Sequence, residues 1–362
     1  MPGLLMGAVA VHRGLLCLLA VAALGHEQDL PPYQAEVAVS GTIRNFGSAF
    51  GGLVKRWEEG FAKAQPKIRF DDKLPTSDAA IPALVTGVAD LAPDGGEAAL
   101  SETLSFFEVY GYPVTEIAVA SGGFDVEGKS NGLVVFVHKD NPIPGLTLAQ
   151  LDGIFGAERT AGMRGFKWTP QDGRPAAKDI RTWGQLGLSG EWADKPIQTY
   201  GHAPSGTARF FQSAVLHNGD KWNPNFREYV ETGSKMIAGE DGQRLGLKQM
   251  LAVELAADRY GIAWTVMPQA KGISGIKPVA LAAREGGAFV VPSKQSFQDR
   301  SYPLARSVYF FLNRAPVKPL EPKLREFLRY VLSREGQEIV ARDGGYLPLP
   351  AAVAREQSRK LD

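Results

Sequence analysis

Cysteine is almost absent from this chain, since Cys17 is the only one among 362 residues. A single cysteine forms no internal disulfide, so the fold suits an oxidising compartment without depending on disulfides. Cys17 follows Leu16 inside an apolar run, whereas lipid attachment would require small residues before a cysteine at the end of the run. We therefore expect no lipid anchor.

The sequence also lacks an excess of either charge. Its 40 Lys and Arg residues balance 39 Asp and Glu residues, and no basic stripe is visible, so we expect no nucleic-acid partner. The five histidines show no metal-ligand spacing, and phosphate-loop and dinucleotide-binding glycine patterns are missing. We expect neither a metal nor a nucleotide cofactor.

One apolar run stands out, at residues 14–25, directly after Arg13. Its 12 residues are too few to span a bilayer, and the run ends in small residues before the polar segment 26–29. We predict a signal peptide over residues 1–25 and a periplasmic or secreted mature protein. Removing Arg13 with the signal lowers the formal charge from +1 to 0.

Strand-like and helix-like segments alternate along the remaining chain. With 44% hydrophobic and 22% charged residues, the composition is that of a soluble protein large enough for two domains. The alternation predicts an α/β fold. Predicted strands include residues 35–39, 133–137 and 307–312, and predicted helices include residues 208–216 and 322–332.

The chain is organised around Ser205, Gly206 and Thr207, which join a predicted strand at 196–200 to the helix at 208–216. The first turn of a helix has unpaired backbone N–H groups and the positive end of the dipole, which suit an oxyanion. Ser and Thr are also the usual N-cap residues. Both interpretations, anion site and plain cap, remain open from these residues alone.

Further turns of this kind follow other predicted strands. Gly47 and Ser48 precede a helix, as do Thr76 and Ser77, and Asp94 lies in a Pro-Asp-Gly-Gly turn. Loops at the carboxyl ends of strands in an open α/β sheet lie together and bind ligands. For Asp94, ordinary turn chemistry is the alternative interpretation.

Residues 128–132 match the G-x-S-x-G pattern of hydrolases. A nucleophile elbow requires a strand before the serine and a helix after it, but here a predicted strand follows. We do not expect Ser130 to be catalytic.

Several motifs together resemble the phosphate-binding proteins of ABC transporters, which are periplasmic receptors with two lobes. The resemblance covers nearly the whole mature chain. Its motifs are Ser205-Gly206-Thr207 before a Phe-bearing helix, residues 146–151 running into Ile154-Phe155-Gly156, Tyr302-Pro303-Leu304-Ala305-Arg306 before a strand, and residues 331–337 with 345–349.

The resemblance implies a role for residues at each turn. Ser48 falls at the first binding loop, Thr76 or Ser77 at the second, and Ser205, Gly206 and Thr207 at the third. Asp94 falls at the carboxylate that accepts a proton from hydrogen phosphate, which would favour phosphate over sulfate.

Two departures from the family pattern matter. The family usually has an arginine shortly before Ser-Gly-Thr, where this chain has Gly201 and His202. The glycine-serine pair usual at the second loop is also missing. Either His202 or Arg209 replaces the missing charge, or the ligand differs from phosphate.

The resemblance implies a type II periplasmic-binding-protein fold with a ligand cleft between two lobes. We place residues 35–129 and 276–350 in the first lobe and residues 130–275 in the second. The implied protein is a monomer and not an enzyme. It captures an inorganic oxyanion, phosphate first, by lobe closure and delivers it to an ABC transporter permease. A secreted phosphoester hydrolase and a sensor or adhesion protein remain alternatives.

Overall fold

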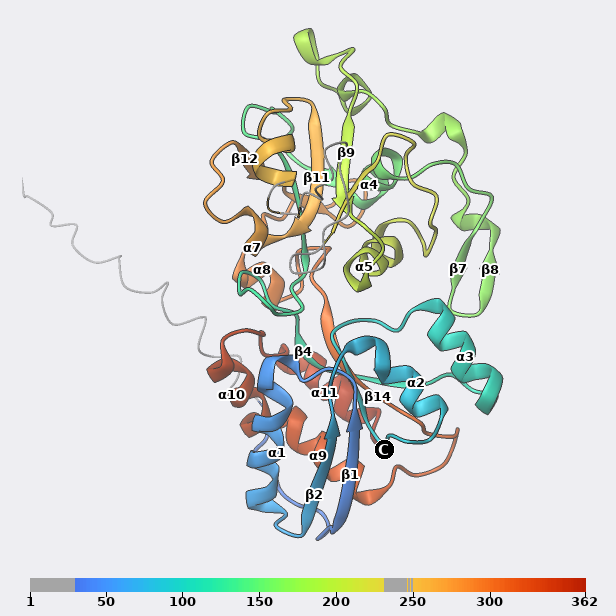
Figure 1. Ribbon diagram of the computed structural model, residues 1–362, viewed down its shortest axis with the longest axis vertical. Coiled ribbons are helices and arrows are strands. Elements are labelled where there is room, and N and C mark those ends of the chain that lie inside the picture. Colours follow the sequence, from blue (N-terminus) through green and yellow to red (C-terminus); the bar gives the residue numbers. More distant parts are fainter. Residues whose placement is uncertain (1–29, 231–245, 247, 249) are drawn as a thin grey trace, which may run out of the picture.

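The computed structural model describes residues 30–230, 246, 248 and 250–362. It has two lobes, one above the other in Figure 1, each with its own strands and surrounding helices. The predicted α/β class and two-lobed arrangement are confirmed. The predicted signal peptide lies outside the described residues.

The first lobe combines a parallel strand pair with a three-stranded antiparallel sheet of order β3-β14-β4. Its strands are β1 (Gly41–Phe46), β2 (Ile68–Lys73), β3 (Ala92–Asp94), β4 (Thr115–Ser121) and β14 (Ser307–Leu312). Its helices are η1 (Phe50–Gly52), α1 (Leu53–Ala64), η2 (Ser77–Ala79), α2 (Ala80–Val85), α3 (Leu100–Tyr110), α9 (Pro322–Leu332), α10 (Arg334–Asp343) and α11 (Ala351–Arg359).

The second lobe is built on a five-stranded sheet of order β10-β9-β11-β5-β12. Its strands are β5 (Leu133–His138), β6 (Leu146–Thr147), β7 (Gly162–Arg164), β8 (Lys167–Thr169), β9 (Gln198–His202), β10 (Arg227–Tyr229), β11 (Gly261–Val266), β12 (Ile276–Pro278) and β13 (Leu281–Ala282). Its helices are α4 (Leu148–Phe155), η3 (Pro170–Asp172), η4 (Ala176–Lys178), η5 (Trp183–Leu186), η6 (Gly190–Trp192), α5 (Gly206–Val215), η7 (Met250–Leu255), α7 (Met267–Ala270) and α8 (Lys294–Gln298).

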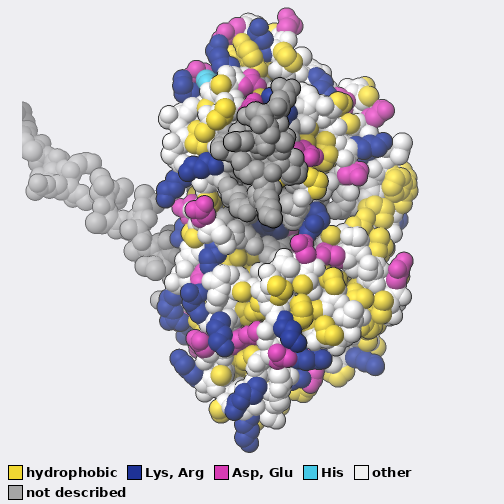
Figure 2. Space-filling model, viewed as in Figure 1, with side chains coloured by type: hydrophobic (Ala, Val, Ile, Leu, Met, Phe, Trp, Pro, Cys, Tyr) yellow, Lys and Arg dark blue, Asp and Glu magenta, His cyan; other side chains and the backbone are white. Residues whose placement is uncertain are grey.

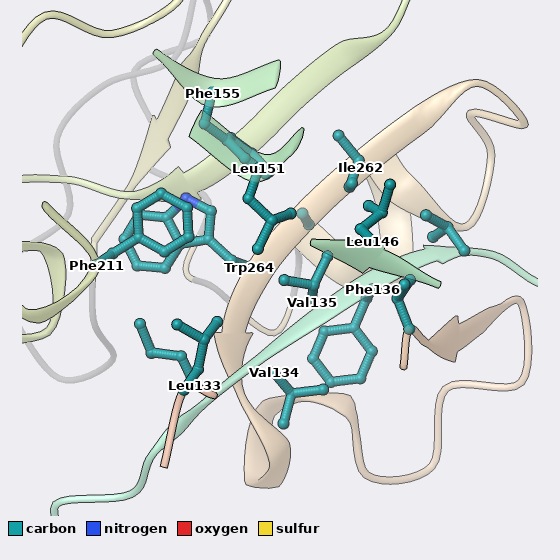
Figure 3. Packing of buried hydrophobic residues seen from close by; sticks show 14 of the residues in the cluster. Leu133, Val134, Val135, Phe136, Leu146, Leu151, Phe155, Phe211, Ile262 and Trp264 are labelled. Atoms are coloured by element: carbon teal, nitrogen blue, oxygen red, sulfur yellow. The ribbon is translucent and has the colours of Figure 1, made fainter. Parts of the chain in front are cut away.

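Each lobe has its own apolar core, formed by the residues that the sequence pattern indicates. On α1, Leu53, Trp57 and Phe61 recur at helical spacing and are fully buried in the first lobe. In the second lobe, residues of β5 and β11 pack with side chains from α4 and α5, among them Phe155 and Phe211 (Figure 3). No helix in the described part of the chain is long and apolar enough to cross a membrane.

Two chain segments cross between the lobes, at residues 122–132 and 304–307. They run side by side, because the amide of Leu133 donates to the carbonyl of Leu304 at 3.0 Å and that of Gly122 donates to Arg306 at 2.8 Å. The crossings therefore form a hydrogen-bonded pair between the lobes.

The structure places the second crossing later than we predicted. Residues 276–278 form β12, which pairs with β5, and Leu281, Phe297 and Leu304 belong to the second-lobe core. The chain therefore returns to the first lobe near residue 304 rather than residue 276. The local sequence of a strand carries no information on which sheet the strand joins.

Two further boundaries of the first lobe differ from the prediction. Residues 35–39 form no strand, and β1 begins only at Gly41. The alternation of buried Ile43 and Asn45 with exposed neighbours identifies the actual strand. At the other end, α11 extends beyond residue 350 and contributes Ala354 to the first-lobe core.

Candidate anion-binding cleft

A cleft of about 420 Å³ lies between the lobes. Both lobes and the crossing segments line it, and the polar residues of its lining include Ser48, Ser77, Asp78, Asp94, Glu97, Glu102, Lys129, Ser130, Asn131, Thr207, Arg209 and Arg306. The lining thus combines hydroxyls, backbone amides and cations with several carboxylates.

The first loop is fixed against the turn that carries Asp94. Gly47 has φ +148°, and a Cβ there would lie 2.2 Å from the carbonyl oxygen of Pro93, so only glycine fits. The next amide, that of Ser48, donates to the same carbonyl at 2.7 Å. This contact brings the Ser48 hydroxyl to the cleft beside the acidic turn.

Asp94 is 7% exposed at the end of β3. Burial, followed by the charge of the nearby Glu102, raises the pKa of its carboxyl to about 7, although the hydrogen bonds from the Gly96 amide and the Ser77 hydroxyl and the charge of Arg306 act in the opposite direction. Ser77 also fixes the turn, because its oxygen accepts from the Gly95 amide at 3.0 Å. Asp94 can therefore hold or release a proton near neutral pH.

The third loop both caps a helix and lines the cleft. Ser205 is the N-cap of α5, and its hydroxyl oxygen accepts from the Ala208 amide at 3.2 Å. The next two residues, Gly206 and Thr207, line the cleft at the start of the helix. The positive end of the α5 dipole is therefore directed at the cleft.

Arg209 lines the cleft but pairs with a carboxylate of the other lobe. Its Nη2 lies 2.8 Å from Oδ1 of Asp78, and both side chains remain substantially exposed. This ion pair joins α5 to η2 across the mouth of the cleft.

Three predicted site residues lie outside the lining. The hydroxyl of Thr76 caps η2 by accepting from Asp78, and Ser205 caps α5. His202 is buried, its Nε2 is 2.9 Å from Oγ1 of Thr265, and its ring stacks on Trp264 at 4.9 Å. These contacts are capping and packing contacts, so the structure does not bring the three side chains to the cleft.

Arg306, which we did not predict as a site residue, supplies a buried cation to the cleft. It lies on the second crossing, and its Nη2 is 3.8 Å from Oε2 of Glu97. The guanidinium also lies 4.8 Å above the ring of Phe210. A Cβ on Gly96 would be 1.7 Å from Nη2, so this glycine makes room for the arginine. Nε of Arg306 has no hydrogen-bond partner among the described residues.

A sequence signal for Arg306 existed, because it ends the Tyr302-Pro303-Leu304-Ala305-Arg306 motif. The prediction named only His202 and Arg209, both near Ser205, as the replacing charge. The fold instead brings a buried arginine to the cleft from the distant crossing segment.

Ser130 lies on the first crossing and lines the cleft. Its Oγ lies close to Gly95, because a Cβ added to Gly95 would be 2.3 Å from this oxygen. Its amide donates to the Tyr346 hydroxyl at 3.3 Å, and strand β5 follows. Among the described residues that line the cleft there is no histidine to activate this serine, and its hydroxyl can donate to a bound anion.

Lys129, next to Ser130, is held by an acidic partner. Its Nζ lies 3.1 Å from Oδ2 of the buried Asp343, which also pairs with Arg56.

Within the described residues, no three His, Cys, Asp or Glu side chains are placed to hold a metal ion.

Comparisons with known proteins identify the family of this chain. Residues 34–335 match the family model described as PBP superfamily domain. The phosphate-binding protein PstS of Pseudomonas aeruginosa is 36% identical over 360 residues, which cover 99% of this chain and 98% of that protein. This chain belongs to the PBP superfamily and, within it, to the family of phosphate-binding proteins named PstS.

More distant proteins share the fold. The phosphate-binding protein PstS of Staphylococcus saprophyticus is 23% identical over 99% of this chain and 93% of its own. The solved structure of PstS from Borrelia burgdorferi has a TM-score of 0.52 at 15% identity, covering 86% of this chain and 99% of that one. This likeness supports the two-lobed arrangement.

Proposed function

We propose that this protein is an extracytoplasmic solute-binding protein that captures inorganic phosphate between its lobes and delivers it to the permease of an ABC importer. The protein acts as a monomer after its signal peptide is removed. The family to which it belongs supports this function, and so does the chemistry of the cleft lining.

Most of the proposed ligand contacts are donors to an oxyanion. The amides of Gly206 and Thr207 lie at the positive end of α5, and the hydroxyls of Ser48, Ser77 and Ser130 line the cleft around them. Arg306 provides the charge that compensates the anion, in place of the arginine expected near Ser205. Charge-assisted hydrogen bonds of this kind are the strong ones in anion sites.

Asp94 is the observation that favours phosphate among oxyanions. An ionised carboxylate repels an anion unless the ligand carries a proton that the two groups can share. Phosphate carries such a proton near neutral pH, and sulfate does not. A site with one buried carboxylate among donors therefore selects the protonated ligand.

The experiment that tests this function is calorimetry of the mature protein, freed of bound ligand by unfolding and refolding, with phosphate, sulfate, molybdate, arsenate and phosphonates. We expect phosphate to bind most tightly. Absence of phosphate binding at millimolar concentration would contradict the proposal. Turnover of a phosphoester by the purified protein would instead favour the hydrolase alternative.

A further inference from the structure

A β-hairpin of the second lobe reaches across to a helix of the first lobe, away from the cleft lining. Phe166, in the turn between β7 and β8, contacts Phe107 of α3, with ring centroids 4.6 Å apart. Figure 1 shows the turn of this hairpin close to α3. Neither phenylalanine lines the cleft. The two lobes therefore meet at a second place.

This part of the surface is unusually apolar. Phe107 and Phe166 are each more than a third exposed, and Val109 and Trp168 are 58% and 59% exposed. In Figure 2, hydrophobic side chains gather along the right edge of the molecule, where the hairpin and α3 meet. Separating the two phenyl rings would expose still more apolar surface to water, which is unfavourable.

The hairpin is held firmly by the helix that carries the third loop of the cleft. Asp172, at the base of the hairpin, accepts two hydrogen bonds from Arg164, and His217, just after α5, lies 3.4 Å from it. Asn218 also donates to the Met163 carbonyl at 3.1 Å. The position of Phe166 is thus tied to the position of α5.

The contact depends on the relative position of the lobes. Phe107 and Phe166 belong to different lobes, and two adjacent crossings join these lobes. We expect a rotation about the crossings that opens the cleft to move the rings apart, because α3, which carries Phe107, also lines the cleft through Glu102. A contact made only in the closed form raises the affinity of any ligand that binds the closed form better.

We propose that Phe107 and Phe166 form a clasp that sets the affinity of the protein for its anion by stabilising the closed form, without touching the ligand. This inference rests on the proposed function, in which phosphate binds by lobe closure. An aromatic pair of this kind changes an equilibrium by about 2- to 10-fold.

The test measures phosphate affinity by calorimetry and phosphate release by stopped flow for Phe107→Ala, Phe166→Ala and the double variant. The matched control is Trp168→Ala, which removes an exposed aromatic side chain from the same hairpin. We expect each single variant to raise the Kd by about 2- to 10-fold, mainly through faster release.

Two further results separate a clasp from general damage to the fold. The Kd of the double variant should not exceed the larger of the two single-variant Kd values, because one substitution already removes the contact. Trp168→Ala should keep the wild-type Kd. An unchanged Kd in both single variants, or strictly additive losses, would overturn the clasp. If the wild type itself fails to bind phosphate, the proposed function fails instead.

Discussion

Arg209 of α5 and Asp78 of η2 form an ion pair of 2.8 Å that connects the two lobes at the mouth of the cleft. Exposed pairs of this kind contribute little to stability, on the order of 0–1 kcal/mol. Arg306, by contrast, has only 8% of its side chain exposed. The two arginines that line the cleft therefore differ in how much water weakens their interaction with an anion.

The first prediction compares these arginines. Arg306→Gln should weaken phosphate binding by roughly 10- to 100-fold, because a buried charge-assisted hydrogen bond is worth about 1.5–3 kcal/mol. Arg209→Gln should weaken phosphate binding by less than about fivefold, because water screens the charge of an exposed side chain. Calorimetry of both variants at one salt concentration checks the difference. Equal losses would contradict the assignment of Arg306 as the main cation.

A second prediction concerns selectivity and pH. Because the pKa of Asp94 is raised to about 7, its carboxyl is protonated below that pH and can donate to sulfate. Above it, the ionised carboxylate repels sulfate but still accepts from hydrogen phosphate. The preference for phosphate over sulfate should therefore increase between about pH 6 and about pH 8.

Asp94→Asn provides the comparison for this effect. The amide is neutral at both pH values, so the variant should show a smaller preference for phosphate, and that preference should change less with pH than the wild type's. Competition calorimetry measures the ratio. A wild-type ratio independent of pH, or one that Asp94→Asn leaves unchanged, would argue against the role of Asp94.

The third prediction separates ligand contact from helix capping in the third loop. A Cβ on Gly206 would meet only Nη2 of Arg209, at 3.6 Å, so Gly206→Val is compatible with the fold. It should nevertheless abolish binding by blocking the approach of the anion. Ser205→Ala should instead leave the affinity nearly unchanged. It should lower the free energy of unfolding by about 1 kcal/mol, because the helix cap is lost. Chemical unfolding and calorimetry measure the two effects, and normal binding by Gly206→Val would contradict the site.

The fourth prediction concerns a buried carboxyl group outside the cleft. Glu58 of α1 accepts a hydrogen bond from Nδ2 of Asn45, which also donates to Asp72. Burial, followed by the charge of Asp72, raises the pKa of Glu58 to about 8 from 4.5. The folded protein thus binds a proton that the unfolded chain releases between these values, so this contribution to stability is lost as the pH rises through about 8.

Glu58→Gln should therefore be more stable than the wild type at about pH 9, by at most about 5 kcal/mol, and should lose less stability between about pH 6 and about pH 9. The neighbouring exposed residue offers a matched control, Glu59→Gln, which should follow the wild-type curve. Denaturant unfolding across this range gives the comparison. If the stability of Glu58→Gln and that of the wild type change with pH in parallel, Glu58 does not hold a proton in the folded protein.

The sequence predicted the elements whose pattern is local. The buried face of α1 follows from its helical periodicity, and β5 follows from its continuous apolar run. The loops with Ser48, Ser77, Asp94 and Gly206 could be grouped because strand ends meet in such folds.

Features that depend on distant partners could not be predicted in this way. The strand at residues 276–278 is only Ile-Lys-Pro, and its pairing with β5 is what assigns it to the second lobe. Arg306 reaches the cleft because Gly96 leaves space for it. The hydroxyls of Thr76 and Ser77 are adjacent in sequence, yet one caps a helix and the other faces the cleft.

The adjacent crossings also determine the order in which the molecule can be completed. The second lobe is one continuous stretch between Leu133 and Leu304, whose backbones are hydrogen-bonded to each other. The first lobe is divided, and β14, the central strand of its antiparallel sheet, follows the whole second lobe in the chain. Because synthesis starts at the N-terminus, the second lobe can fold before β14 has been made. Until then, β3 and β4 of the first lobe remain unpaired. Aggregation or proteolysis during synthesis should therefore concentrate on these two unpaired strands.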